Sequence, residues 1–531
     1  MINQLTALGY LVARPGWAIL CGFILCSCTT VGPSYQELDV KWLSRWQPDL
    51  YGQLNNASSQ HQHELSFWWQ LFDDESLNQL ILEGYQENID LQLAGLRVLE
   101  SRAQLGVAGS LLYPQLQQVN GSAIAAETRR RGGALSSQDQ SLISYQTGFN
   151  LGWELDFWGK FKRSVESADA AFFASVANQQ NMQVLITAQI ADLYFAYRTI
   201  EHRIAIANKN IQIQKRSYEI TEKVYQSGQD SELDLQQAKA QYLATLSTVP
   251  LLELSLINTR NALSLLLARP PGYIPELKAP HNSTLPTVHS IDLQDIPANL
   301  LIRRPDIRAA AWQVASQSAQ IGIAEADYYP SISLIGSISW SGSTVNAAAD
   351  NSLIGIGPGF TWNIFDYGRI ADNIRVQDAR FQKLVERYQQ TALVAAREVD
   401  DAAVAIVKTA EKIDILSQAV HASERGLTLA NARYKEGYSG FQRVLDAQRS
   451  VFAQTEQAVV NQGNHIRAVV GLYKALGGGW ERKPLTETIS PRLKNRLKKR
   501  TDWGDLLDSS ATAVPEQKEG STTDGGVSQH E

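Results

Sequence analysis

Hydrophobic residues recur along this chain with two different periods. Residues 161–226 contain neither proline nor glycine. Within them, apolar or aromatic residues recur every seven positions, at Ile204, Ile211, Tyr218 and Tyr225. The same spacing returns later in the chain, at Ile413, Val420, Leu427 and Tyr434. A seven-residue period predicts long helices that pack as left-handed coiled coils. At a rise of about 1.5 Å per residue, such a helix is about 100 Å long.

Each long helical segment follows two segments in which apolar and polar residues alternate. The first pair covers residues 115–126 and 144–155, and the second covers residues 331–341 and 354–365. Alternation with a period of two predicts β-strands, and the polar loop inside each pair predicts a β-hairpin. The strand lengths are close to the roughly 9–11 residues that a tilted strand needs to cross a bilayer.

Glycines mark the ends of the predicted elements. Gly159 and Gly368 follow the strand ends and precede the long helices. Trp153 and Trp362 lie in those strand ends, and tryptophan is suited to a boundary between lipid and water. We therefore expect a strand to lead directly into a long helix at both places.

Two further glycines divide each long helical segment. Gly228 and Gly437 predict the turns of two long helical hairpins, at about residues 160–267 and 369–476. Pro250 predicts a kink in the returning helix of the first hairpin only.

The two halves of the chain are predicted to be copies of one unit. An offset of 209 residues aligns Trp153 with Trp362, and an offset of 216 aligns the Tyr-Pro pair at 113–114 with the pair at 329–330. Each unit contains a helix, a β-hairpin at about 115–155 or 331–365, and a long helical hairpin. The predicted segments are repeat 1 at residues 65–270, a proline-rich linker at 271–290 and repeat 2 at 291–480.

The two ends of the chain differ from these units. Residues 1–27 have the pattern of a signal peptide, with an apolar run at residues 16–25. The run ends in L25-C-S-C28, which resembles the bacterial lipobox. That resemblance implies a lipid on Cys28, at the start of an extended segment over residues 28–64; the alternative is an ordinary cleaved signal. The polar residues 481–531 predict a largely disordered tail.

Composition excludes several functions. A net charge of -6 does not fit a general nucleic-acid binder. All cysteines lie at or before Cys28, so no thiolate metal site can form later in the chain. His61 and His63 have no clustered carboxylates beside them, and we expect no metal and no cofactor. No phosphate-binding loop and no group of nucleophile, base and orienting residue is found, so an enzyme is not predicted.

A membrane-crossing chain would have to use its strands. No segment after the signal peptide has eighteen consecutive apolar residues, so no transmembrane helix is predicted. Four strands cannot close a barrel, and open edges in lipid would leave backbone groups unpaired. Several copies would therefore contribute to one barrel.

Three motifs, together with the lipobox and the duplicated unit, make residues 28–480 similar to the outer-membrane efflux factors of the TolC/OprM/NodT type. The motifs are F67-W-W-Q-L-F-D-D-E-S-L77, R303-R-P-D-I-R308 and L472-Y-K-A-L-G-G-G-W480. The resemblance implies a mixed α and β membrane protein. Three identical chains would form a twelve-stranded β-barrel, with four strands per chain, continuous with an α-helical coiled-coil tunnel in the periplasm.

The same resemblance implies the function and the partners. It implies a passive efflux channel in the bacterial outer membrane, with no cofactor other than the covalent lipid on Cys28. The expected partners are outer-membrane lipid, a periplasmic adaptor (membrane fusion) protein and an inner-membrane RND-type transporter. Nucleic acid is not among them.

The resemblance also places a gate at the periplasmic helix tips, in F441-Q-R-V-L-D-A-Q-R449. There Asp446 and Arg449 would link neighbouring subunits and hold the tunnel shut. Gln442 departs from the family pattern, which has leucine at this position, and puts a hydrophobic plug in doubt. Glu232 and Asp234, at the other tip, are weaker candidates for entrance carboxylates. The alternative for Asp446 and Arg449 is an exposed pair within one helix, contributing at most about 0.5 kcal/mol.

Two other functions fit parts of the pattern. An outer-membrane duct for type I protein secretion would share the architecture, but it commonly lacks the lipobox and the A-L-G-G-G-W ending. A lipid-anchored coiled-coil scaffold without a pore would not need the four alternating strands. The sequence does not distinguish drugs, metals, solvents or metabolites as the exported compound.

Overall fold

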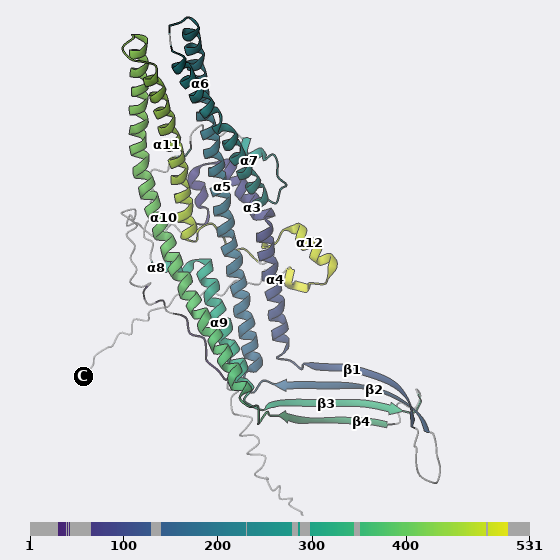
Figure 1. Ribbon diagram of the computed structural model, residues 1–531. Coiled ribbons are helices and arrows are strands. Elements are labelled where there is room, and N and C mark those ends of the chain that lie inside the picture. The colour runs from purple at the N-terminus through teal and green to yellow at the C-terminus, as the bar shows by residue number, and fades with distance from the viewer. Residues whose placement is uncertain are drawn as a thin grey trace, which may run out of the picture. The chain divides into compact units, whose positions relative to one another are not determined.

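The computed structural model describes residues 30–38, 40, 42, 65–128, 140–229, 231–278, 285–286, 298–344, 351–484 and 487–507. Within these residues the chain consists of long helices and one antiparallel sheet (Figure 1). The predicted signal peptide, Cys28, His61 and His63 lie outside the described residues, as do residues 508–531.

The first half, residues 65–278, begins with helices and continues with two strands and a long helical hairpin. Its elements are η3 (Trp68–Phe72), α3 (Glu75–Glu87), α4 (Ile89–Ser110), β1 (Leu116–Thr128), β2 (Gln140–Leu155), α5 (Lys160–Gln226), α6 (Glu232–Leu246), α7 (Thr248–Leu266) and η4 (Pro275–Lys278).

The second half, residues 298–484, has its elements in the same order. They are α8 (Ala298–Arg303), α9 (Pro305–Ala326), β3 (Ser331–Gly342), β4 (Asn351–Thr361), α10 (Arg369–Lys435) and α11 (Gln442–Ala475). The chain continues with α12 (Pro491–Arg500) and η6 (Gly504–Leu507).

The returning helix differs between the two halves. In the second half α11 is continuous over 34 residues, whereas in the first half α6 ends at Leu246 and α7 begins at Thr248. Pro250 is the third residue of α7. Proline is tolerated in the first turn of a helix, where its missing N–H has no partner to lose. The kink predicted near Pro250 is therefore a break between two helices.

The four strands form one antiparallel sheet in the order β1-β2-β3-β4 (Figure 1). Leu116 pairs with Gly152, Tyr145 with Gly342, and Ser331 with Thr361. The edge strands β1 and β4 have no second partner among the described strands. The sheet therefore has two open edges.

The boundaries of all four strands differ from those predicted, most of all in β2 and β4. β2 begins at Gln140, before the predicted residue 144, and β4 ends at Thr361, before the predicted residue 365. Thr361 lies opposite Ser331, the first residue of β3, so no β3 residue is left to pair with Trp362. Alternation in the sequence continued past the point where pairing stops.

The described chain divides into two compact units. One contains the sheet and comprises the described residues within Met1–Glu37, Ser101–Phe172 and Trp312–Val385. The other comprises the described residues within Leu38–Glu100, Phe173–Ala311 and Glu386–Glu531. The predicted junction residues lie in the first unit and the predicted gate residues in the second.

The three sequence motifs meet in the core of the second unit. Trp68 stacks on Tyr473 with ring centroids 5.3 Å apart and an interplanar angle of 6°. The N–H of Gly479 donates to the carbonyl oxygen of Leu65 at 2.9 Å. The guanidinium of Arg308 lies 5.8 Å from the ring centroid of Trp480. Motifs that are hundreds of residues apart in the sequence therefore serve one packing site.

The prediction that residues 481–531 form a largely disordered tail is partly wrong. Residues 487–507 pack on α4, where Leu497 and Leu507 join Leu99 and Ile489 in a buried cluster. Ser490 caps α12 by accepting from the N–H of Leu493. Ile489, Leu493 and Leu497 recur every four positions within a basic sequence, which is a helical pattern. The sequence did not show that this face packs on Leu99 of α4, which is far away in the chain.

One helical stretch is apolar enough on average to cross a membrane, although it contains no run of eighteen consecutive apolar residues. Residues Glu232–Leu266, which comprise α6 and α7, are long and apolar enough to cross a membrane by length and composition, although such a stretch alone is weak evidence. Only 17% of its most apolar window is buried. Much of its exposure comes from leucines on α7, namely Leu251, Leu254 and Leu265.

Candidate functional site

The two helical hairpins end in turns of the same type. Gly228 has a φ of +76° and Gly437 a φ of +78°. In each turn the residue after the glycine donates its N–H five residues back, from Gln229 to Val224 and from Tyr438 to Arg433. These are Schellman-type helix ends, in which glycine takes the left-handed conformation without steric cost.

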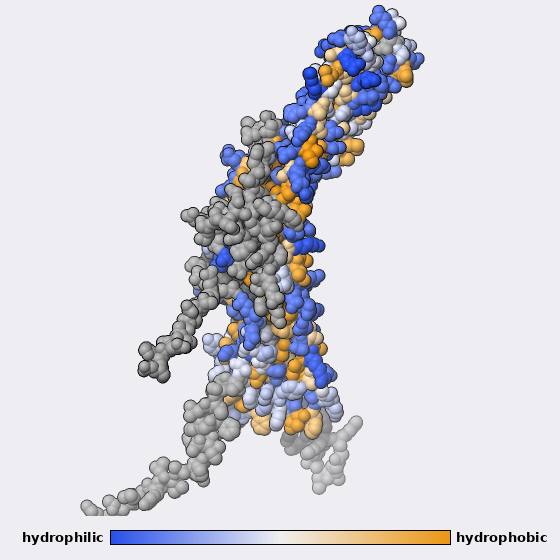
Figure 2. Space-filling model, turned by 90° about the vertical axis from the view of Figure 1, so that its left-hand side faces the viewer, coloured by the Kyte–Doolittle hydropathy of each residue, from blue (hydrophilic) through white to orange (hydrophobic). Residues whose placement is uncertain are grey.

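Below the turns, α6 and α11 pack on each other. Phe441, Val444 and Leu445 of α11 form a buried cluster with Ala238 of α6. The cluster is flanked by four partly buried residues, Tyr218, Leu427, Ala430 and Tyr434. The tip surface visible at the top of Figure 2 is mainly hydrophilic. A small apolar contact thus joins the two hairpins beneath a polar surface.

Asp446 and Arg449, the predicted gate pair, form an ion pair within α11. Nη1 of Arg449 lies 3.1 Å from Oδ1 of Asp446, and the two side chains are 50% and 57% exposed. Gln442 donates from Nε2 to the same carboxylate oxygen at 3.0 Å. All three predicted gate residues therefore lie in one hydrogen-bonded group. Within one chain, the pair is half exposed and lies in a single helix.

Gln241 of α6 also belongs to this group, and it was not predicted. Its Oε1 accepts a hydrogen bond from Nε of Arg449, which ties α11 to α6. Gln241 is buried, whereas Arg449 is half exposed. The contact joins residues 208 positions apart, so no local pattern indicated it. The repeat would not have found it either, because Gln241 aligns with Ser450.

Several glutamine oxygens at the tips have no partner within the described chain. Oε1 of Gln237, of Gln442 and of Gln448 is buried and accepts no hydrogen bond there. Gln237 is the first-half residue that aligns with Asp446. Buried acceptors without a donor are unfavourable, so these three amides reduce the stability of the tips within one chain.

The predicted entrance carboxylates lie in the first turn of α6. Ser231 caps this helix through the N–H of Asp234 at 3.2 Å and donates its hydroxyl hydrogen to Asp234 Oδ2 at 2.8 Å. Glu232 is exposed in the same turn. Acidic residues at a helix N-terminus interact favourably with the helix dipole and stabilise the helix. This effect explains the presence of both carboxylates without a role in transport.

The two strand-to-helix junctions have a common design. Gly159 has a φ of +74° and Gly368 a φ of +87°. Asp156 accepts hydrogen bonds from the first N–H groups of α5, and Asp366 accepts them from Ile370 and Gly368. The N–H groups of Ile370 and Gly368 lower the pKa of the Asp366 carboxyl below its usual value.

The tryptophans predicted at the junctions lie in different surroundings. Trp153, in β2, pairs with Leu334 and is partly buried. Trp362, beyond the end of β4, is 52% exposed and donates from Nε1 to the carbonyl oxygen of Tyr328 at 2.9 Å.

Residues just after the predicted lipid site are held against the first junction. The N–H of Val31 donates to the carbonyl oxygen of Trp158 at 3.1 Å. Arg163, which is 4% exposed, donates to the carbonyl oxygens of Val31 at 3.1 Å and of Gly32 at 2.9 Å. Cys28 itself is outside the described residues.

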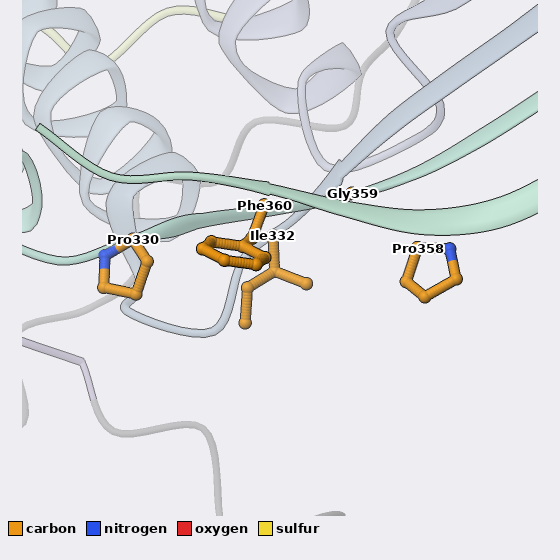
Figure 3. Close-up of a pocket in the computed structure, with 5 residues that line it drawn as sticks. All are labelled: Pro330, Ile332, Pro358, Gly359 and Phe360. Carbon is orange, nitrogen blue, oxygen red and sulfur yellow. The ribbon is translucent and has the colours of Figure 1, made fainter.

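The sheet has an apolar depression where β3 begins and β4 ends (Figure 3). It is lined by Pro330, Ile332, Pro358, Gly359 and Phe360. None of these side chains can donate, accept or exchange a proton, so the depression has no catalytic chemistry. Within the described residues, no group of three or more histidine, cysteine, aspartate or glutamate side chains is placed to hold a metal ion.

A four-stranded sheet whose strands lead into long helical hairpins with polar tips is the fold of solved outer-membrane channels. Residues 80–269 and 296–478 match the family described as outer membrane efflux protein. The chain belongs to this family. It is an outer-membrane protein that extends into the periplasm.

Relatives match along most of their length. Probable outer membrane lipoprotein SilC of Salmonella typhimurium is 30% identical over 86% of this chain and 97% of its own. Cation efflux system protein CusC of Escherichia coli O157:H7 is 31% identical over 87% of this chain and 98% of its own. Pyoverdine export outer membrane protein OpmQ of Pseudomonas putida is 29% identical over 78% of this chain and 88% of its own.

Solved structures share the fold. The outer-membrane channel OprN has a TM-score of 0.77 and 29% identity, over 85% of this chain and 99% of that one. CusC has a TM-score of 0.73 and 27% identity, over 85% of this chain and 100% of that one. The open state of the Neisseria gonorrhoeae MtrE channel has a TM-score of 0.72 and 27% identity, over 86% and 99%.

Proposed function

We propose that this protein is the exit duct of a tripartite efflux assembly, in which three copies form one channel. The observation that carries the proposal is the four-stranded sheet with open edges at β1 and β4. A sheet edge exposed to lipid leaves backbone N–H and C=O groups without partners, which costs several kcal/mol per group. Three copies supply twelve strands, and a closed twelve-stranded barrel has no edges.

The long helices form the tunnel of this channel. Each chain contributes α5 with α6 and α7, and α10 with α11. A periplasmic adaptor contacts the helix tips and links the duct to an inner-membrane RND-type transporter. The duct is passive, and the transporter selects the exported compound. The names of the relatives fit this division, since CusC is named for cation efflux and OpmQ for pyoverdine export.

A lipid on Cys28 anchors each copy beside the strand-to-helix junction. Thr30 packs against Gly159 at that junction. Two residues span at most about 7 Å, so the lipid lies close to the place where the strands meet the helices. This is where the inner leaflet of the outer membrane would end. Acyl chains contribute about 0.8 kcal/mol per buried methylene group, so two or three chains give a stable anchor.

The gate is formed by the tips of the helical hairpins. Three symmetry-related Asp446 carboxylates near a threefold axis repel one another and attract cations. Arg449 moderates this field, and its bonds to Asp446 and Gln241 fix its position between α11 and α6.

Two measurements test the duct. The protein is extracted from outer membranes, run unheated and heated on denaturing gels, and reconstituted in planar bilayers. A heat-sensitive species with three times the mass of the chain and discrete single-channel currents are expected. A monomer without conductance would contradict the proposal. Replacing Cys28 by serine should abolish metabolic labelling with palmitate, and retained labelling would refute the anchor.

A further inference from the structure

The first strand-to-helix junction forms a contact across the middle of the sheet, which we call the inner seam. It joins the end of β2 and the start of α5 to the end of α9 and the start of β3. Trp158 stacks on Tyr329, with ring centroids 4.6 Å apart and an interplanar angle of 22°. Its Nε1 donates to the carbonyl oxygen of Pro330 at 2.8 Å. The inner seam is therefore closed within one chain.

The inner seam continues along the helices beyond the junction. Ser167 of α5 donates to the carbonyl oxygen of Ser316 in α9 at 3.0 Å, and it is 5% exposed. A Cβ atom on Gly322 of α9 would lie 3.0 Å from Nε of Arg163 in α5. Small residues thus allow α5 and α9 to approach each other closely.

The repeat places equivalent residues on the two outer sides of the same unit. The offset of 209 residues carries Trp158 to Tyr367 and Ser167 to Val376, and the offset of 216 carries Tyr329 to Tyr113 and Gly322 to Gly106. These four residues form two surfaces, one at the β4–α10 junction and one at the α4–β1 junction.

Both of these surfaces are uncovered. Tyr367 is 103% exposed, Tyr113 is 69% exposed and Val376 is 46% exposed. A Cβ atom on Gly106 would meet nothing within 4 Å among the described residues. The corresponding residues of the inner seam are all in contact. Since β1 and β4 are the opposite edges of the sheet, the two surfaces are on different sides of one chain.

We propose that the β4–α10 surface of one copy packs on the α4–β1 surface of the next copy. The contact is equivalent to the inner seam within one chain, so Tyr367 packs on Tyr113 and Pro114 of the neighbouring copy. We call this contact the outer seam. It rests on the proposed function, in which three copies form a ring. The contact is head-to-tail, and a head-to-tail contact that closes gives a ring rather than a two-fold dimer.

The two seams differ in two contacts, and the sequence explains both differences. Arg163 binds the N-terminal segment in the inner seam, and the aligned residue is Asp372, which pairs with Arg375 at 2.7 Å. Each chain has one N-terminal segment, and it occupies the inner seam. Likewise the ion pair of Lys160 with Asp327 has no counterpart, because Leu111 aligns with Asp327. The outer seam therefore lacks the contacts that Arg163 and Lys160 make in the inner seam.

Cross-linking between introduced cysteines tests the contact in the full chain. All native cysteines precede residue 30, so introduced thiols stand alone in the rest of the protein. The variant Tyr113→Cys with Tyr367→Cys, treated with a short bismaleimide in membranes, should lose its monomer band and yield covalent dimers and trimers. The variant Trp158→Cys with Tyr329→Cys should link within the chain and keep the mass of a monomer.

Three controls make the result specific. Tyr113→Cys alone and Tyr367→Cys alone should give no covalent oligomer. Tyr113→Cys with Val376→Cys should also give none, because Val376 lies nine residues further along, about 13 Å of helix. Oligomers from this third control at the same yield would overturn the proposed register.

The outcomes separate the contact from the function it rests on. If the untreated protein is a conducting trimer and the inner-seam pair reacts, but Tyr113→Cys with Tyr367→Cys stays monomeric, the outer seam is wrong and the duct stands. Covalent dimers without trimers would overturn the head-to-tail arrangement. If the untreated protein is neither trimeric nor conducting, the duct fails and the outer seam with it.

Discussion

Asn88 in the first half and Arg304 in the second half occupy aligned positions, and each donates a hydrogen bond to an aligned carbonyl oxygen. Asn88 donates from Nδ2 to the carbonyl oxygen of Leu266 at 2.8 Å, and Arg304 donates from Nη1 to the carbonyl oxygen of Ala475. Both acceptors are the last residues of a returning helix. Both side chains are buried, at 2% and 7% exposure.

The chemistry of the two contacts differs. Asn88 is neutral and also caps α4 through the N–H of Leu91. Arg304 carries a charge that is paired with Asp306 at 2.8 Å and with Glu398 at 2.9 Å. Both halves have the hydrogen bond to the end of the returning helix, whereas the donor side chain forms ion pairs only in the second half. Aligned substitutions in the two halves should therefore have unequal effects.

The largest difference is expected at this pair. Arg304→Ala should lower the free energy of unfolding by about 3 kcal/mol, because it leaves two carboxylates without their cation. Asn88→Ala should cost about 1–2 kcal/mol, the value of a lost helix cap and an unpaired carbonyl. Thermal unfolding of the detergent-solubilised protein measures both. Equal losses would show that the charge in the second half adds nothing.

The junction glycines should rank second. Gly368→Ala should cost about 1–2 kcal/mol, because alanine is strained at positive φ. Gly159→Ala should cost more, since its Cβ atom would also lie 2.6 Å from Thr30, whereas the Cβ atom at Gly368 would lie 4.0 Å from Asp372. Gly159→Ala should also expose the N-terminal segment to protease. If the two variants unfold alike, the close approach of Thr30 is not important for stability.

At the tips the effect on stability should be small and the effect on conductance large. Asp446→Ala with Arg449→Ala should cost about 1 kcal/mol, because the ion pair is half exposed and Oε1 of the buried Gln241 loses its donor. The double variant should nevertheless leak in planar bilayers if these residues hold the aperture shut. Gln237→Ala, at the aligned position of the first hairpin, is the control and should not leak. Unchanged closed-state current in the double variant would refute the gate.

The smallest effect is expected from Asp366 and depends on pH. Its pKa is lowered by the N–H groups of Ile370 and Gly368. The carboxylate therefore stabilises the folded chain above about pH 4, the ordinary pKa of aspartate, and this contribution is lost as pH falls through the lowered pKa. Asp366→Asn should unfold earlier than the unmodified protein at pH 7, and the difference should shrink as the pH falls below about 4. A difference that stays constant as the pH falls would contradict this explanation.

Much of the fold could be predicted from the sequence, because its signals are local and long. A run without proline or glycine predicted α5, which spans 67 residues, and alternation predicted the four strands. Strand ends were less accurate, since the end of β4 is set by the first residue of β3 and not by its own sequence. Helix α12 was missed because its folding depends on Leu99 in α4, far away in the chain.

The candidate site was predictable only in part. Asp446, Arg449 and Gln442 are close in sequence and form one group in the structure. Gln241 joins them from α6, and no periodicity or spacing relates it to Arg449. The same holds for Arg163, whose partners Val31 and Gly32 come from the N-terminal segment.

The sequence alone determined the kinds of elements, their order and the glycine turns, because each depends on hydrophobic period or backbone freedom over a few residues. It also determined the family, through motifs that share one packing site. Only the tertiary structure decided which aligned residues are covered and which are open. Trp158 is covered by Tyr329, whereas the aligned Tyr367 is fully exposed. The sequences around Trp158 and Tyr367 are nevertheless alike. Contact depends on where the sheet ends, and in this chain the sheet ends at β1 and β4.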